Sequence, residues 1–313
     1  MQNNFIKYCF LFFTPLIIGY ALLEYLTLEL PSSFKANKTA INLKQEKFET
    51  LILGSSQMMV GINAEWIDSP TLNLATGSQH HNTDFKLIKS LSPKFKNLKT
   101  VVLEVSYSHF ELPHNGMKFW KNPLYLKFYN VNMYERQTYF KDKLVFLKNP
   151  SLFLNDVYDY YFKNNLSYSI NDYGFNTINY NDYFKELNYN ENEISQITKL
   201  DINTKENLDL FNNNTKLFFE ILDYLEDKKI HIIICKVPMY KTFLNQRNEN
   251  ILKRRDSILN VVLKKYKGVE ILDLEEDTIN FKVTDYKNDS HLNPDGAKIF
   301  TQKLNEVINN INY

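Results

Sequence analysis

Two short polar segments of the chain carry the residue types that nucleophilic acyl chemistry needs. The first follows an apolar run, LILGSSQ, and delivers Gly54, Ser55 and Ser56 into an expected turn. The second, NDSHLNPDGA, holds His291 just before an expected helix. A serine becomes a nucleophile when a base lies within hydrogen-bond reach and a third group orients that base. The two segments therefore predict a serine–histidine site, although each one alone is more often an ordinary turn or a surface histidine.

The elements that must position these segments alternate between short apolar runs and amphipathic stretches. Runs such as TVVLEV and IHIIICKV are continuously apolar and β-branched, as in strands that helices cover on both faces. Expected strands are Thr50–Leu53, Thr71–Ala75, Thr100–Val105, Lys229–Val237 and Val269–Leu274. Expected helices are Asn82–Leu91, Lys205–Leu225, Asn248–Tyr266 and Pro294–Ile308. This order predicts an α/β fold, a three-layer sandwich around a central parallel sheet, with Ser56 at the carboxyl edge where such folds place their sites.

The alternation breaks between about residues 109 and 196. Residues 151–200 include 10 Asn and 8 Tyr, a composition rich in turn formers and in amphipathic aromatic surface. We interpret this segment as an ordered insertion, because it has too many aromatic residues to stay disordered. A lid, a glycan-binding surface or a partner surface would fit, and so would an excursion with a biased composition.

The composition limits the class of protein. The 313 residues are 44% apolar and 23% charged, which excludes a wholly disordered chain. Lys and Arg number 37 against 36 Asp and Glu, a net charge of +1, so we expect no nucleic-acid partner. Apart from Gly54-Ser55-Ser56 no glycine-rich loop precedes a helix, and we expect no cofactor.

The first thirty residues resemble a membrane anchor. The run YCFLFFTPLIIGYALL carries no charge, and with its flanks it gives about 20 residues, enough to span a hydrocarbon core of about 30 Å. Lys7 is the only charge before the run, which favours a cytoplasmic N-terminus. A cleaved signal peptide or a buried core helix are the alternatives. We expect an anchor over residues 1–30, a linker over 31–48, and a domain over 49–313 that faces the periplasm or the exterior of a bacterial cytoplasmic (inner) membrane.

Together the motifs resemble the SGNH (GDSL-like) hydrolase superfamily. GSSQ ends the first expected strand, NLATGSQ follows the second, and the terminal segment holds HLNPDGA. The resemblance implies that Ser56 is the nucleophile, that His291 is the general base, and that the backbone N–H groups of Ser56 and Gly77 form the oxyanion hole. A single anchor followed by GSS is similar to membrane-anchored cell-envelope O-acyltransferase-like members, such as the D-alanyl transfer protein of teichoic acid modification and acetyltransferase-like proteins of exopolysaccharide export.

The chain departs from that pattern in three places. Ser55 replaces the usual aspartate before the nucleophile. The family's acid usually lies three residues before the histidine, where this chain has Asn288; Asp289 is our preferred acid, with Asp285 as a further candidate and Asn288 as a possible orienter. The oxyanion-donating asparagine of the third block has no clear counterpart. Ser106 or Ser108 is the candidate donor there.

The resemblance implies a serine O-acyltransferase or esterase that acts on acyl esters of cell-envelope polysaccharide. A multi-spanning membrane acyltransferase is the implied partner, besides the acylated glycan and the membrane. The alternative is a catalytically inactive glycan-binding or scaffold module of a polysaccharide export complex. His80 and His81 follow the second block, but the sequence offers no third ligand at a suitable spacing, so we expect no metal and interpret the pair as substrate-side polar groups or helix-cap neighbours.

Overall fold

A five-stranded parallel sheet organises the protein. The computed structural model describes residues 2–164, 168–197 and 202–311. The strands are β1 (Thr50–Ile52), β2 (Thr71–Asn73), β3 (Thr100–Glu104), β4 (His231–Lys236) and β5 (Val269–Asp273), and their order in the sheet is β2-β1-β3-β4-β5. All neighbouring strands are parallel. The order reverses direction beside β1, so the carboxyl ends of β1 and β3 flank the position where open α/β sheets bind ligands.

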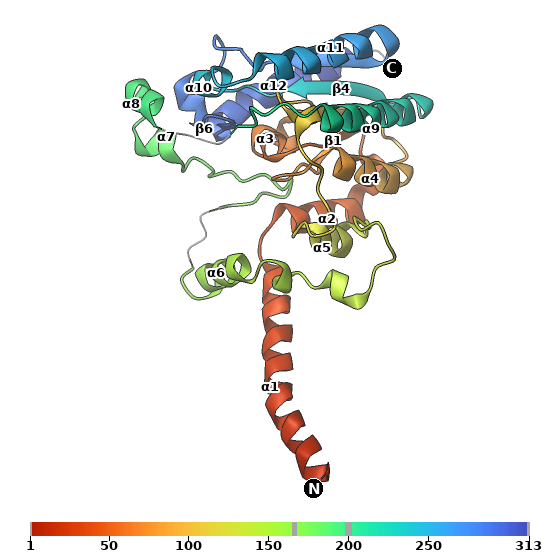
Figure 1. The fold of residues 1–313 in the computed structure, drawn as a ribbon, viewed down its shortest axis with the longest axis vertical. Helices are drawn as coiled ribbons and strands as arrows, with labels where there is room; N and C mark the ends of the chain where they lie inside the picture. Colours follow the sequence, from red (N-terminus) through yellow and green to blue (C-terminus); the bar gives the residue numbers. More distant parts are fainter. Residues whose placement is uncertain (1, 165–167, 198–201, 312–313) are drawn as a thin grey trace.

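Helices cover both faces of this sheet (Figure 1). Alternate strand residues point to opposite faces, so Leu51 and Val101 join one apolar core whereas Ile52 and Val102 join the other. The principal covering helices are α3 (Ser56–Gly61), α4 (His81–Leu91), α9 (Leu208–Asp227), α11 (Glu249–Lys265) and α12 (Pro294–Asn310). The predicted α/β class, with its five strands and four long helices, is confirmed, and the ends differ from the expected ones by three residues or fewer.

The first helix, α1 (Gln2–Glu29), projects away from the domain (Figure 1). Its residues Asn4–Glu29 have a mean hydropathy of 1.8 and are long and apolar enough to cross a membrane. Apart from Tyr20, the large apolar side chains between Phe5 and Leu22 are exposed, so this stretch is not a helix of the domain core. From Glu24 onward the helix packs on the protein, and the Glu24 carboxylate accepts hydrogen bonds from the backbone N–H groups of Val145 and Phe146 at 2.8 Å.

Residues 31–48 are not the linker that their polar composition suggested. They form α2 (Ser33–Lys44) and a 3-10 turn, and α2 buries Phe34 and Ile41 in the core. The spacing of those two residues places them on one face of the helix, while its lysines remain at the surface. A single apolar face among many polar residues was enough to dock the helix.

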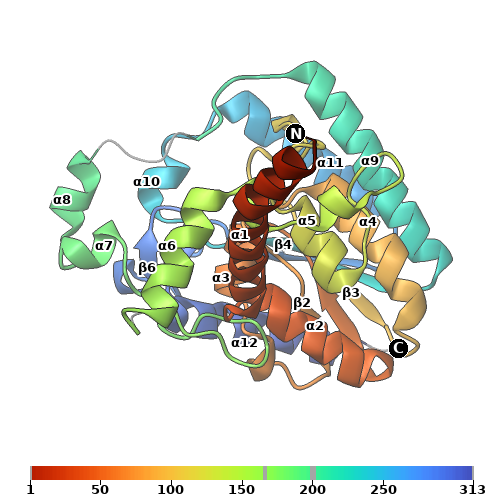
Figure 2. The ribbon, with the colours of Figure 1, turned by 90° about the horizontal axis from the view of Figure 1, so that it is seen from below.

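The insertion lies partly between α1 and the sheet, next to α2 (Figures 1 and 2). Its helices are α5 (Asn122–Leu124), which continues into a π-helical turn, α6 (Pro150–Tyr161), α7 (Tyr183–Glu186) and α8 (Glu191–Gln196). Tyr125 and Phe184 are fully buried, so the described parts of the insertion are packed as expected from their aromatic content. Residues 165–167 of the insertion lie outside the described residues.

Candidate functional site

The turn that carries the predicted nucleophile is built by three residues between β1 and α3. Gly54 has a φ of +137°, and a Cβ at that position would lie 2.7 Å from a carboxylate oxygen of Glu104, so both conformation and space require glycine. Ser55 caps α3, because its hydroxyl accepts a hydrogen bond from the backbone N–H of Gln57 at 3.2 Å. Ser56 is therefore the first residue of the helix, with its N–H group at the positive end of α3.

Two buried carboxylates that the sequence analysis missed lie beneath this turn. Glu104, the last residue of β3, accepts hydrogen bonds from the backbone N–H of Ser55 at 2.6 Å and from its hydroxyl at 2.9 Å. Asp84 of α4 is fully buried and accepts a hydrogen bond from the side-chain amide of Gln79 at 2.7 Å. Burial raises the pKa of Glu104, and it raises the pKa of Asp84 to about 8. The sequence signal for Glu104 was its place as a lone glutamate inside the apolar run TVVLEV.

A hairpin near the C-terminus brings His291 to Ser56. Strands β6 (Tyr286–Asn288) and β7 (His291–Leu292) are antiparallel and joined by a two-residue turn, so Asn288 and His291 are directly paired. The Nε2 atom of His291 lies 2.8 Å from the Ser56 hydroxyl oxygen, and its Nδ1 atom lies 2.9 Å from the side-chain oxygen of Asn288. The structure therefore places Ser56, His291 and Asn288 in one hydrogen-bonded row.

The surroundings of Asn288 fix the tautomer of the histidine. The amide nitrogen of Asn288 donates to the Asp182 carboxylate at 2.6 Å, so the amide oxygen must face the imidazole. An amide oxygen only accepts, and the proton of the neutral ring therefore lies on Nδ1. The lone pair of Nε2 then faces the Ser56 hydroxyl, which is the arrangement that a general base needs. Asp182 belongs to the insertion, and no local sequence pattern pointed to it.

The preferred acid, Asp289, does not orient the imidazole. As the first residue of the hairpin turn it points away from the paired strands, and its carboxylate accepts hydrogen bonds from the hydroxyl groups of Tyr183 and Thr242. Asp285 is also elsewhere, since its carboxylate accepts the backbone N–H of Lys282 at 2.7 Å. Because side chains alternate in direction along a strand, the position paired with His291 decides the contact, and that position is Asn288.

The imidazole is held in its neutral form. Burial, together with the nearby Lys287 ammonium, lowers the pKa of His291 to about 4, and the Asp182 carboxylate opposes this shift. The ammonium nitrogen of Lys287 is 4.0 Å from the Asp182 carboxylate. At neutral pH the ring can therefore accept a proton from Ser56.

Gly77, the second expected oxyanion donor, lies beside the nucleophile. A Cβ built on Gly77 would be 3.9 Å from the Cβ of Ser56. Among the described residues, the backbone N–H groups of Ser56 and Gly77 have no hydrogen-bond acceptor. The Lys121 ammonium, from the insertion, donates to the Gly77 carbonyl at 2.5 Å and to the Thr76 hydroxyl at 3.1 Å, and burial lowers the pKa of Lys121 to about 8.

The third-block serines line the site without reaching Ser56 by a hydrogen bond within the part of the chain that the structure describes. The Ser106 hydroxyl is 3.3 Å from Nδ1 of His109. Ser108 lines the same cavity as Ser106. A role of either serine as oxyanion donor stays a prediction.

Two cavities meet at Ser56 and His291. The first, of about 410 Å³, is the anchor-side cavity; it is also lined by Pro31, Ser33, Val60, Tyr168 and Phe175. The second, of about 400 Å³, is the turn-side cavity; it is also lined by Gln57, His80, Ser106, His109 and Phe243. Ser56 therefore borders a cavity on each of two sides.

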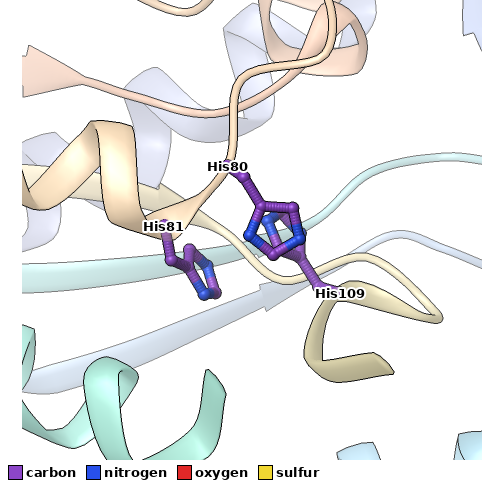
Figure 3. A group of neighbouring side chains, drawn as sticks. All are labelled: His80, His81 and His109. Carbon is purple, nitrogen blue, oxygen red and sulfur yellow. The ribbon is translucent and has the colours of Figure 1, made fainter. Parts of the chain in front are cut away.

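The expectation that His80 and His81 have no third partner is wrong. His109, which lies 28 residues further along the chain, joins them, and one ring nitrogen from each of the three residues lies within 4.8 Å of the other two. Figure 3 shows the three rings side by side, with His80 and His81 at the start of α4 and His109 in the turn after β3. Sequence spacing did not reveal this group, because the two turns meet only at the edge of the folded sheet.

Several solved structures are similar to this one, including those of two bacterial proteins. No protein-family model matches the chain, and neither does any curated protein. A protein of Bacteroides fragilis, provisionally described as an acylhydrolase, aligns with a TM-score of 0.40 and 9% identity over 90% of this chain and 92% of that one. A protein of Streptococcus pneumoniae, provisionally described as a platelet activating factor, aligns with a TM-score of 0.41 and 10% identity over 93% and 99%.

Proposed function

We propose that the protein is a serine enzyme of the SGNH type that cleaves acyl esters and transfers the acyl group. The observation that carries this proposal is the 2.8 Å contact between the Ser56 hydroxyl and Nε2 of His291, two residues 235 positions apart. The pair lies at the carboxyl edge of the sheet, with the ring oriented from behind by Asn288. A nucleophile, a base and an orienting group in that geometry support acyl transfer through a covalent intermediate.

The reaction has two balanced steps. The Ser56 oxygen attacks the carbonyl carbon of an acyl ester while its proton passes to Nε2 of His291. The tetrahedral intermediate then expels the alcohol, which takes that proton, and leaves the acyl group on Ser56. An incoming hydroxyl group or water then gives its proton to Nε2 and attacks the carbonyl carbon of the acyl-serine. The bond to the Ser56 oxygen breaks, that oxygen takes the proton back from Nε2, and a new ester or an acid is released.

The charge that develops on the carbonyl oxygen needs donors that are already in place. In our proposal these are the backbone N–H groups of Ser56 and Gly77. The Ser56 group belongs to a helix N-terminus, which favours negative charge, and Lys121 holds the turn that carries Gly77. Removing one donor of an oxyanion hole typically costs about 100- to 1000-fold in rate.

The two cavities favour transfer over simple hydrolysis. A transferase must bring a donor ester and an acceptor alcohol to the same serine, and each cavity reaches Ser56 from its own side. Residues 31–33, which directly follow the apolar helix, line the anchor-side cavity. We assign the acyl donor to that cavity and the acceptor, a hydroxyl group of a cell-envelope polysaccharide, to the turn-side cavity. A multi-spanning membrane acyltransferase would supply the donor.

The proposed location is the outer face of a bacterial cytoplasmic membrane. About 20 residues of α1 are needed to cross the hydrocarbon core, which matches the exposed stretch that ends near Leu22. The contact between Glu24 and the insertion supports an anchor that stays attached, because cleavage of a signal peptide would remove a docked part of the domain. The domain then lies outside the membrane, as the single charge at Lys7 favours.

The decisive experiment compares the full-length protein in detergent with its Ser56→Ala variant. We expect a fluorophosphonate probe to label the native protein, and an acyl ester to leave an adduct on the Ser56 peptide by mass spectrometry. Ser56→Ala should lose both and at least about 1000-fold of the ester-cleaving rate. Ser55→Ala, at the neighbouring hydroxyl, is the matched control and should still be labelled. Full activity in Ser56→Ala would end the proposal.

The second candidate function is a glycan-binding or scaffold module without catalysis. Its specific support is the amide of Asn288 where a carboxylate would better stabilise the imidazolium ion. No labelling of the native protein, under conditions that label a known serine esterase, together with retained binding of an acylated polysaccharide, would select this candidate.

A further inference from the structure

The strongest unassigned feature of the molecule is the buried group formed by His80, His81 and His109. The three side chains are at most 7% exposed, and their rings stack closely, with centroids of His81 and His109 4.1 Å apart. Both ring nitrogens of His80, Nδ1 of His81 and Nε2 of His109 are buried without a hydrogen-bond partner among the described residues. A buried polar atom without a partner costs free energy, so each of these nitrogens is a candidate for binding a ligand.

The hydrogen bonds of His81 and His109 leave one ring nitrogen of each with a lone pair that can bind a cation. The Nε2 atom of His81 is 2.9 Å from the carbonyl oxygen of Glu104, which can only accept, so Nε2 carries the proton and Nδ1 has a free lone pair. The Nδ1 atom of His109 is 3.3 Å from the Ser106 hydroxyl and 3.9 Å from the Glu104 carboxylate, which leaves Nε2 free in the same way. Metal-ligating histidines are oriented by such partners.

We propose that His80, His81 and His109 bind a divalent transition metal ion of the zinc class. Three imidazole nitrogens are a ligand set that suits Zn²⁺, whereas Mg²⁺ and Ca²⁺ prefer oxygen ligands. Nitrogens around a tetrahedral Zn²⁺ are roughly 3.3 Å apart, so side-chain movements of about 1 Å close the observed group around an ion. The remaining coordination position would take water or a group from the turn-side cavity, which His80 and His109 line.

The ion would cross-link two turns that lie 28 residues apart in the chain. His80 and His81 follow the turn that carries Gly77, whereas His109 begins the 3-10 turn after β3. Holding these turns together would stabilise the edge of the sheet that faces the nucleophile. We therefore expect the ion to raise the melting temperature of the folded protein by roughly 5 °C or more at saturating concentration.

The test is a titration of the chelator-treated, full-length protein in detergent with Zn²⁺ alone. We expect one ion per chain by calorimetry, a visible absorption band when Co²⁺ replaces Zn²⁺, and the rise in melting temperature. His109→Phe keeps an aromatic ring but removes the nitrogen, and His80→Asn changes a side chain whose nitrogens make no hydrogen bond within the described residues. Each variant should lower the Zn²⁺ affinity by at least about 100-fold.

The matched control is His231→Phe, which removes a histidine of β4 that lies outside the group and should leave the affinity unchanged. Circular dichroism of the metal-free variants establishes that each is folded, and His80→Asn serves if His109→Phe is not. Failure of the native protein to bind Zn²⁺, or equal binding by the native protein and the folded ligand variant, would overturn the proposal. The measurement is metal binding, so its outcome is independent of the acyl-transfer function.

Discussion

Asn288 and His291 face each other across a two-residue hairpin turn, with 2.9 Å between the amide oxygen and Nδ1 of the imidazole. The Asp182 carboxylate lies behind the amide and accepts its N–H at 2.6 Å. The amide therefore stands between the base and a negative charge, where serine hydrolases commonly have the carboxylate in direct contact. This relationship leads to the first two predictions.

Moving the carboxylate next to the imidazole should increase the rate. The double variant Asn288→Asp with Asp182→Asn keeps the two side-chain shapes and reverses the order of amide and carboxylate. A carboxylate in contact with Nδ1–H stabilises the imidazolium ion that forms in the transition state, so we expect kcat with an ester substrate to rise by about 10-fold. The single variant Asp182→Asn should instead lower kcat by about 10-fold. Equal rates for the native protein and both variants would show that Asp182 has no part in the reaction.

The pH dependence should reflect the buried base. Burial lowers the pKa of His291 to about 4, and the protonated ring cannot accept the Ser56 proton. We expect kcat/KM to stay high at pH 5 and to fall as the pH decreases through about 4, not near 6.5. Lys287→Met should move this fall in kcat/KM to higher pH, because the Lys287 charge lowers the pKa of His291. Asp182→Asn should move it to lower pH, because the Asp182 charge raises that pKa. An acidic limb near 6.5 in the native protein would contradict the burial of the base.

The same shift makes the folded protein less stable in mild acid. The unfolded chain binds a proton on His291 below about pH 6.5, whereas the folded state excludes it until about pH 4. The unfolded state thus holds more protons in that window, and the free energy of unfolding falls as the pH decreases through it. His291→Gln should reduce this slope in urea unfolding measured between pH 4.5 and 6.5.

Replacing Ser55 by aspartate should destabilise this protein. Ser55→Asp places a second carboxylate where the Ser55 N–H and hydroxyl contact Glu104 at 2.6 and 2.9 Å. Two buried carboxylates in contact repel, and we expect a loss of about 2–4 kcal/mol in the free energy of unfolding at pH 8. Adding Glu104→Gln should recover at least half of that loss. If the single variant unfolds like the native protein, Glu104 is not the carboxylate that supports the turn.

Lys121 should act on the rate by holding the Gly77 turn. Lys121→Met keeps most of the apolar stem but removes the ammonium group that donates to the Gly77 carbonyl at 2.5 Å. We expect kcat to fall by about 10- to 100-fold with little change in KM, because a misplaced N–H group weakens oxyanion binding. Lys118→Met, at an exposed neighbour in the same segment, is the control and should retain the native kcat. A change confined to KM would assign Lys121 to substrate binding.

Glu24 should fix the insertion to the end of α1 that is nearest the domain. Glu24→Gln removes the negative charge that accepts the N–H groups of Val145 and Phe146, and hydrogen bonds to charged groups contribute about 1.5–3 kcal/mol. We expect faster protease cleavage within residues 139–162 in detergent and a lower melting temperature. Glu29→Gln, whose carboxylate contacts exposed Lys35, should behave like the native protein.

Local sequence patterns were sufficient to predict the strands and helices and to select Ser56 and His291 as candidate site residues. Runs such as TVVLEV read as buried strands, and amphipathic periods read as helices, because both patterns express local geometry of the backbone. Ser56 and His291 stood in polar segments at the ends of such elements, and parallel strands bring their carboxyl ends to one edge. The prediction of a linker over residues 31–48 was wrong because the few apolar residues of α2 are separated by lysines and other polar residues in the sequence.

The groups that surround Ser56 and His291 could not be predicted from the sequence, because they come from segments that meet only in the folded chain. From the segment Asn288-Asp289-Ser290-His291 alone, either Asn288 or Asp289 could orient the imidazole, and in the folded hairpin it is Asn288 that contacts the ring. Asp182 and Lys121 come from an insertion without strand or helix periodicity, and His109 reaches His80 and His81 only where two turns meet. Contacts between distant turns depend on how the sheet and its loops pack, and the spacing of residues along a chain carries no record of that packing.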